Sequence, residues 1–215
     1  MNRYELKSRA KEALQGKWII AIAFTIIALI LGNIRLSTDT SFFRFSGSWM
    51  DHLRILTPFD SVTSSISSLI NFVLSGPVAY GVAFFYLNML REDDARVESM
   101  LQGFKRFLDT LLAYLFISIF TFLWFLLLII PGIIAGLSYS MTYYIMIDHP
   151  ELTPLEAIRL SKEIMMGHKG ELFVLGLSFI GWFFLGLITF GIGLLYVIPY
   201  FNATLAEYYL SIKGE

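Results

Sequence analysis

The most constraining feature of this sequence is a series of apolar segments, each long enough to cross a lipid bilayer as a helix. In the clearest of them, residues 108–130, Asp109 is the single charged side chain. A transmembrane helix needs about 20 predominantly apolar residues. In addition, 56% of the 215 residues are of the types AVILMFWYC and only 15% are charged, whereas soluble domains carry about 25% charged residues. The sequence therefore predicts an all-α fold, a polytopic membrane helix bundle.

Six segments of this kind divide one membrane domain, residues 1–215, into spans and connections. The expected transmembrane helices are 18–34, 62–90, 108–130, 133–147, 172–190 and 194–212. The connections are expected as cytoplasmic amphipathic helices at 1–17 and 148–171, a cytoplasmic segment at 91–107 and an external loop at 35–61. Glycine and proline are expected to break the second span at Gly76-Pro77 and to form turns at Pro131-Gly132 and at 191–193.

The Lys and Arg residues predict how these spans are oriented. With the N-terminus inside, thirteen of the 16 lie in cytoplasmic segments, while Arg35, Arg44 and Arg54 lie in the external loop. Positive charges near span ends are retained on the cytoplasmic side of a membrane. We therefore expect six crossings with the N- and C-termini in the cytoplasm.

The cytoplasmic segments also share a pattern that predicts an internal repeat. Each contains a glycine that closes an amphipathic stretch and is followed by a cation and an aromatic residue: Gly16, Gly103 and Gly167. Each returning span has a proline at or near its outer start (Pro77, Pro131 or Pro199) and an aromatic inner end (85–87, 143–145 or 208–210). We interpret the chain as three pseudo-repeated units, each an interfacial helix followed by a transmembrane hairpin. The alternative is that membrane helices resemble one another by default, with aromatic belts at both interfaces.

The third interfacial helix is the most fully specified segment of the chain. Thr153 at the N-cap, Pro154 at the first helical position and Glu156 predict a capping box, and Gly167 is the expected terminator. A helical projection places Glu156, Arg159, Lys162 and Glu163 on one face and Ala157, Ile158, Leu160, Ile164 and Met165 on the other. Because these charges cancel, we expect apolar burial or docking onto the bundle to hold the helix. Its candidate functional residues are Thr153, Glu156, Ile158, Arg159, Lys162, Gly167, His168 and Lys169.

Several motifs, taken in order along the chain, resemble a known family. They are residues 131–134, 139–141, 157–162, 166–169, 177–182, 189–193 and 199–200, with 10–11 and 16–18 near the N-terminus. Over these residues the chain resembles the uncharacterised bacterial membrane-protein family called domain of unknown function 975. The resemblance implies a six-span protein of the bacterial cytoplasmic membrane, with no established reaction and no catalytic residues. A weaker likeness, through the Pro-Gly turn and the helix with Ala157 and Ser161, is to membrane domains of some glycerophosphodiester phosphodiesterases.

Charge and motif content argue against several classes of function. A net charge of −1 removes the electrostatic case for binding nucleic acid. The absence of cysteine excludes disulfides and thiolate metal sites, and the serine-hydrolase, Walker and dinucleotide patterns are missing. His149 and His168 flank the third interfacial helix, but their spacing fits no standard ligand pattern, so ordinary interfacial histidines are favoured over a metal site. We expect no catalysis, no cofactor and no bound metal.

Two polar features inside the spans leave transport open. The first is a stripe on the second span whose members step by three or four residues: Ser61, Ser64, Ser68, Asn71 and Ser75. It either lines a water-filled vestibule or, as favoured here, bonds to neighbouring helices. The second is Glu207, which shares the sixth span with Asn202. Snorkelling, or pairing with a cation such as Lys169, is favoured for Glu207 over a proton or substrate relay.

The expected function is therefore that of a non-catalytic scaffold, partner-binding or lipid-interacting protein of the membrane. Membrane lipid is the expected partner, with another protein or a second copy of the chain as further candidates. The first alternative is a small permease or lipid transporter whose path follows the second-span stripe and broken helices at Pro77 and Pro199. The second alternative, an accessory role in glycerophospholipid metabolism, rests on the weaker likeness alone.

Overall fold

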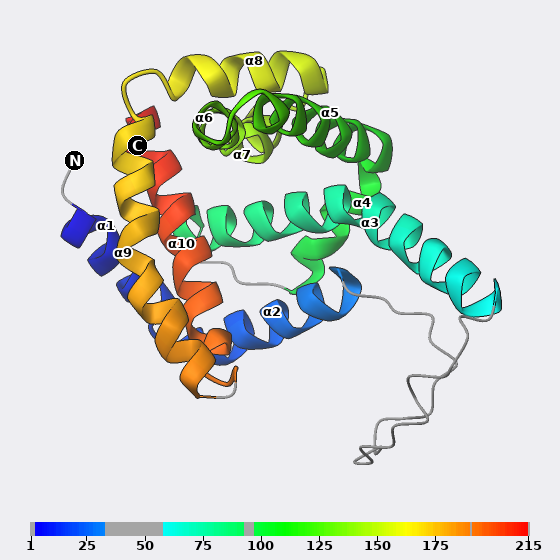
Figure 1. Ribbon diagram of the computed structural model, residues 1–215. Coiled ribbons are helices and arrows are strands. Elements are labelled where there is room, and N and C mark those ends of the chain that lie inside the picture. The colour runs from blue at the N-terminus through cyan, green and yellow to red at the C-terminus, as the bar shows by residue number, and fades with distance from the viewer. Residues whose placement is uncertain (1–2, 33–57, 93–96, 190, 215) are drawn as a thin grey trace.

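Helices form every regular element in the residues that the computed structural model describes, which are 3–32, 58–92, 97–189 and 191–214 (Figure 1). The α-helices are α1 Arg3–Leu14, α2 Trp18–Gly32, α3 Pro58–Arg91, α4 Gln102–Lys105, α5 Phe107–Leu127, α6 Ile129–Tyr139, α7 Thr142–Asp148, α8 Pro154–Ile164, α9 Lys169–Ile188 and α10 Leu194–Lys213. A 3₁₀ helix, η2, spans Val97–Leu101. The all-α fold is confirmed. Most of the expected external loop lies outside the described residues, and its last four positions belong to α3.

Four helical segments are long and apolar enough to cross a membrane: Ser65–Arg91, Phe107–Leu127, Ile129–Asp148 and Lys169–Gly186. A fifth is reached only if α1 and α2, which are bent by 96°, form one broken span. Alone, α2 has 15 residues and is short for a crossing. In α10, polar residues such as Asn202 and Glu207 lower the hydropathy. Six spans are therefore not all supported by length and composition.

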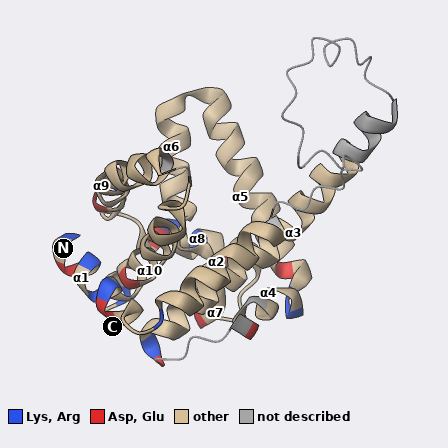
Figure 2. Cartoon of the chain, turned by 90° about the horizontal axis from the view of Figure 1, so that it is seen from below, with Lys and Arg blue, Asp and Glu red and all other residues tan. Residues whose placement is uncertain are grey.

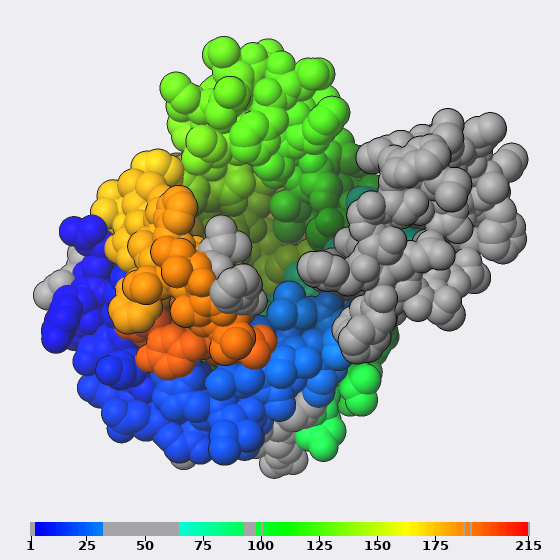
Figure 3. Space-filling view, turned by 60° about the horizontal axis from the view of Figure 1, so that its bottom comes forward, coloured from blue at the N-terminus to red at the C-terminus, as the bar shows by residue number. Residues whose placement is uncertain are grey.

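The helix α10, which carries Asn202 and Glu207, is largely enclosed by protein. Ten residues of α10 are buried, Glu207 among them, and the helix contacts α1, α2, α3 and α9. By contrast, the α5–α6 hairpin stands out from the body in the space-filling view (Figure 3), and residues 126–130 at its tip are all at least 64% exposed. Charged residues lie mostly away from the tip of this hairpin (Figure 2). An apolar outside around a more polar inside is the arrangement that a bilayer favours.

The helix α3 runs without interruption from Pro58 to Arg91 and passes through Pro77. The break expected at Gly76-Pro77 is absent, and α10 is likewise continuous through Pro199. The two glycines of this region serve a close crossing of backbones instead. A Cβ at Gly76 would lie 2.4 Å from the carbonyl oxygen of Thr110, and one at Gly103 would lie 2.0 Å from that of Pro77. Neither glycine can be replaced without moving a backbone.

The hairpin between α5 and α6 turns at a single residue, Leu128, whose backbone is extended at φ −164° and ψ 151°. The turn therefore lies three residues before the expected Pro131-Gly132. Pro131 falls in the first turn of α6, where N–H groups have no intrahelical acceptor, so its missing donor costs nothing there. Gly132 makes room for the ring of Phe125, because a Cβ would lie 2.4 Å from its Cγ.

Candidate functional site

Asp148, the last residue of α7, ties the ends of three helices together. Its carboxylate accepts hydrogen bonds from Arg91 at the end of α3 (Nη2, 3.0 Å), from the Tyr209 hydroxyl (2.6 Å) and from Lys213 Nζ (2.9 Å), the last two in α10. The Asp148 side chain is only 5% exposed. Because a buried carboxylate must be paired and hydrogen-bonded, these four residues, the Asp148 junction, hold the three helix ends at one place.

Buried tyrosines lie one helical turn before the charged residues of the junction. They are Tyr86 in α3, Tyr144 in α7 and Tyr209 in α10, each at most 4% exposed. The rings of Tyr144 and Tyr209 stack with centroids 5.2 Å apart, and all three belong to the same hydrophobic core. The aromatic inner ends singled out in the sequence therefore meet inside the protein, and the junction closes the core above them.

Glu207, 9% exposed, forms an ion pair with Arg9 of α1 at 3.3 Å. Its cation is thus Arg9 and not the expected Lys169. The pairing is made by the packing of α1, whose Leu6, Ala10 and Leu14 are buried and which lies against α10. Burial of this apolar face brings Arg9 to a carboxylate 198 positions away in sequence. The expected N-terminal amphipathic helix is therefore docked onto the bundle.

The helix α8 has the local structure that the sequence predicts. The Thr153 hydroxyl accepts a hydrogen bond from the Glu156 backbone N–H, and Glu156 accepts one from the Thr153 backbone at 2.8 Å, which completes a capping box. Hydrogen bonds from the Thr153 hydroxyl and backbone lower the pKa of Glu156. Ile158 is 4% exposed, whereas Arg159 on the opposite face is exposed. Gly167, at φ 84°, closes the segment in the left-handed conformation that glycine adopts without strain.

One hydrogen bond fastens α8 to the α5–α6 hairpin. The Ser161 hydroxyl, fully buried, donates to the carbonyl oxygen of Ser138 in α6 at 2.8 Å. Docking onto the bundle is therefore what holds α8.

The described members of the second-span polar stripe differ in their surroundings. The Ser61 and Ser64 side chains lie outside the described ones. Ser68 is exposed and Asn71 is half-buried. The Ser75 hydroxyl donates to the carbonyl oxygen of Asn71 within the same helix, at 2.6 Å. Among the described residues the Asn71 Oδ1 is buried without a hydrogen-bond partner, so the expected bond to a neighbouring helix is not made by that atom.

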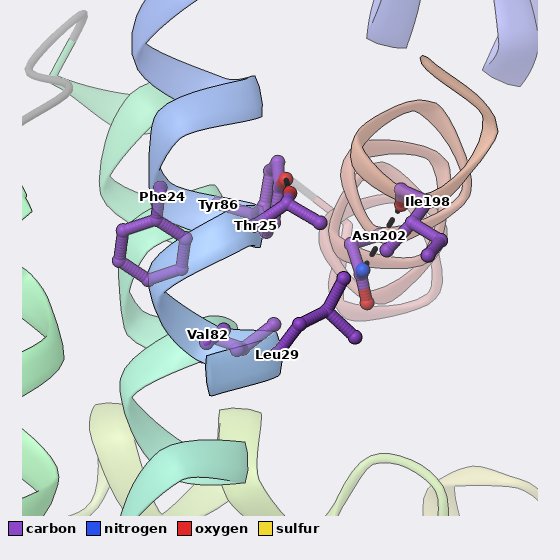
Figure 4. A pocket seen from close by; sticks show the side chains of 8 residues that line it. Phe24, Thr25, Leu29, Val82, Tyr86, Ile198 and Asn202 are labelled. Atoms are coloured by element: carbon purple, nitrogen blue, oxygen red, sulfur yellow. Dashed lines mark hydrogen bonds between the residues drawn. The ribbon is translucent and has the colours of Figure 1, made fainter. Parts of the chain in front are cut away.

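A cavity of about 180 Å³ lies between α2, α3 and α10 (Figure 4). It is lined by Phe24, Thr25, Ala28, Leu29, Val82, Tyr86, Ile198 and Asn202. Its polar side chains are partly occupied within the protein: Asn202 donates to the carbonyl oxygen of Ile198 at 3.0 Å, and the Thr25 hydroxyl donates to that of Ala21 at 2.8 Å. The cavity can hold a small apolar molecule and offers it little polar contact.

The two histidines beside α8 are engaged separately. His149 Nδ1 lies 3.0 Å from Glu151 and His168 Nδ1 lies 3.3 Å from Glu171. A backbone hydrogen bond, together with the bond to His149, lowers the pKa of Glu151. Within the described part of the chain, no three metal-ligating side chains come together.

Comparison with known families places the whole chain. The family described as Protein of unknown function (DUF975) matches residues 1–134 and 125–215, which together cover the chain. The chain belongs to this family. The resemblance to DUF975 inferred from the ordered motifs is thus confirmed. No curated protein and no solved structure matches this DUF975 protein, and the weaker likeness to glycerophosphodiester phosphodiesterase domains is not supported. Because DUF975 carries no stated activity, the function must be inferred from the geometry.

The residues that join the helices in this DUF975 chain are not evident from its sequence alone. They include the Asp148 junction and Arg106, which donates to the carbonyl oxygens of Met146 at 3.2 Å and Pro150 at 2.8 Å. A pattern was available, because Arg91, Asp148 and Lys213 each follow an aromatic inner end by about one helical turn. Spacing along the chain does not reveal that charges on different helices meet, since that depends on packing.

Proposed function

We propose that this protein is a non-catalytic, multi-pass protein of the bacterial cytoplasmic membrane that acts as a scaffold, with lipid and protein partners bound on a fixed helical bundle. The Asp148 junction carries the proposal. Transporters and intramembrane enzymes keep ionisable groups available inside the membrane. Here the buried carboxylates of Asp148 and Glu207 are each held by a cation from another helix, which suits a structural role.

The junction also supports the proposed orientation. The C-terminal ends of α3, α7 and α10 meet there, as they must if the second, fourth and sixth spans all return to the same side of the membrane. We propose that this side is cytoplasmic, because it holds most of the Lys and Arg residues. A cysteine placed at Lys162 should be labelled only from inside, and one at Ser48, outside the described residues, only from outside. External labelling at position 162 would overturn the orientation.

Three pseudo-repeated units are part of the proposal, and the shared sequence of buried tyrosine followed by a charge supports them. The glycines support them less evenly. Gly16 and Gly167 adopt positive φ values of 78° and 84°, whereas Gly103 lies within α4 and accommodates Pro77. A repeat that has diverged at its middle unit accounts for both observations.

Substitution of the two buried carboxylates tests the scaffold. Hydrogen bonds to a charged group contribute about 1.5 to 3 kcal/mol each, so Asp148→Asn should lower the free energy of unfolding in detergent by about 2 kcal/mol or more. Glu207→Gln should also destabilise the protein. The matched control is Glu163→Gln, which removes an exposed carboxylate of α8 and should leave stability unchanged. If Asp148→Asn and Glu207→Gln are as stable as the wild type, the carboxylates are reserved for another task and the scaffold proposal falls.

The cavity beside Asn202 favours a second candidate, a small permease. Its path would run between α2 and α10, because the helices at Pro77 and Pro199 are unbroken. A cysteine in place of Asn202 distinguishes the candidates, since thiolates form where water reaches them. Reaction with a membrane-impermeant thiol reagent would support the permease, and a lack of reaction is expected for the scaffold.

A further inference from the structure

A groove of about 330 Å³ lies where α8 and the start of α9 meet the α5–α6 hairpin. Figure 1 shows α8 lying along this hairpin, with α9 beginning at its end. The groove is lined by Trp124, Pro131, Ile134, Ala135, Ser138, Tyr139, Lys162 and Lys169. It is separate from the Asp148 junction and from the cavity beside Asn202, with which it shares no lining residue.

The groove has one charged end and one apolar end. Ser161 bonds to the carbonyl oxygen of Ser138, which places the adjacent Lys162 beside the C-terminal half of α6. Pro131, at the other end of the lining, is seven residues before Ser138, or about 10 Å along a helix at 1.5 Å per residue. The surface therefore passes from ammonium groups to aliphatic and aromatic side chains over a distance comparable to part of an acyl chain.

The two lysines bring positive charge that the groove itself does not neutralise. No acidic side chain is in the lining. Within the described residues, the ammonium group of neither Lys162 nor Lys169 takes part in a hydrogen bond or an ion pair. In this they differ from Arg9 and Arg91, which are bound by carboxylates. Although the charges of α8 cancel over the helix as a whole, Lys162 is the charged residue of α8 that lines the groove.

We propose that this groove binds one phospholipid with a net negative headgroup, taken from the cytoplasmic leaflet. The phosphate lies at the ammonium groups of Lys162 and Lys169, and an acyl chain follows α6 towards Trp124. Basic pockets between membrane helices bind anionic lipid headgroups in this way, and Tyr139, which follows Ser138 at the charged end, is of a residue type favoured at the level of the headgroups. The inference rests on the proposed function, since it requires α8 to face the inner leaflet.

Lipid binding to the purified protein tests the groove. Phosphatidylglycerol is titrated into delipidated protein in mild detergent, and the bound lipid is counted by native mass spectrometry. The paired substitution Lys162→Ala and Lys169→Ala should raise the Kd about thirtyfold, or about 2 kcal/mol for two cations. The control pair Lys11→Ala and Lys105→Ala removes the same charge from exposed positions outside the groove and should leave the Kd unchanged. Equal loss in both pairs would show non-specific attraction and overturn the proposal.

Two further arms use the wild-type protein and do not depend on the folding of a variant. Phosphatidylcholine, whose headgroup is neutral, should bind much more weakly than phosphatidylglycerol, and equal binding would overturn the requirement for an anion. Free glycerol phosphate should not displace the lipid, and full displacement would make this a soluble-phosphate site. If phosphatidylglycerol fails to bind while Asp148→Asn still destabilises the protein, the groove proposal alone falls. Release of the protein from membranes by alkaline carbonate would instead refute the proposed function.

Discussion

Replacement of Gly103 by alanine should be among the most damaging small changes in this protein. The added Cβ would lie 2.0 Å from the carbonyl oxygen of Pro77 and 2.8 Å from its carbonyl carbon. An ordinary contact begins at 3.4 Å, so α4 and α3 would have to separate by about 1.4 Å. The obstacle is backbone, which cannot rotate away as the end of a side chain can. Overpacking costs about 1 to 3 kcal/mol, and we expect the upper end of that range.

The matched control is Gly136→Ala, another glycine inside a helix. Nothing lies within 4 Å of a Cβ built there, and replacing a helical glycine by alanine stabilises by roughly 0.5 to 1 kcal/mol. Because both glycines lie in helices, this gain is common to the two variants, which should therefore differ by the overpacking cost of about 3 kcal/mol. Gly76→Ala, whose Cβ would lie 2.4 Å from the Thr110 carbonyl oxygen, should resemble Gly103→Ala.

The measurement is the free energy of unfolding in mixed micelles, with thermal stability by fluorescence-detected size exclusion as a second readout. Gly103→Ala should unfold at a clearly lower denaturant fraction, or fail to accumulate, while Gly136→Ala behaves as the wild type or better. Equal stability of Gly103→Ala and Gly136→Ala would refute the close crossing of α3 and α4.

Three further predictions concern α8 and the second span. Thr153→Ala removes the N-cap and should lower the free energy of unfolding by about 1 kcal/mol. Because the pKa of Glu156 is lowered on folding, the capping box should stabilise the protein above the ordinary carboxyl pKa, and this stabilisation should be lost as the pH falls through the lowered pKa. Stability measured against pH should show this loss in the wild type and not in Glu156→Gln. Ile158→Asp places a charge on the buried face of α8 and should reduce expression of folded protein, and normal yield with unchanged thermal stability would show that the face is not held by packing. Asn71→Leu removes a buried amide oxygen that has no partner among the described residues, so stability should be unchanged or higher. A cysteine at that position should not react with an impermeant thiol reagent, and clear labelling would favour a water-filled vestibule along this span.

Local structure was largely predictable from this sequence. The capping box of α8 and the turn at 191–193 depend on a few adjacent residues, and each lies where its residues predict. The helix α8 itself ends at Ile164, three residues before the left-handed Gly167. Pro77 shows the limit of such rules. Proline disfavours helix interiors, yet α3 continues through it, because neighbouring helices stabilise a helix in a membrane protein enough to tolerate a missing backbone donor.

The partners of buried charges were not predictable for a different reason. Glu207 pairs with Arg9 and not with Lys169, which is closer in sequence. The reason is that α1 packs against α10, with a bend of 96° between α1 and α2. The groove at Lys162 and Lys169 depends in the same way on where α8 meets α6. Composition identifies such residues as costly to bury, but the choice of partner follows from helix packing.

The central position of α10 has a consequence for biosynthesis. Membrane helices leave the ribosome in chain order, so α10 arrives after every helix that will surround it. A carboxylate entering lipid is costly on its own, whereas Glu207 enters beside Arg9, which is already in place. The space for α10 must stay unfilled until α10 itself has been made, and chains shortened before Leu194 would leave Asp148 without two of its three donors. Such chains should be recognised by quality-control proteases, so that only the full-length protein accumulates.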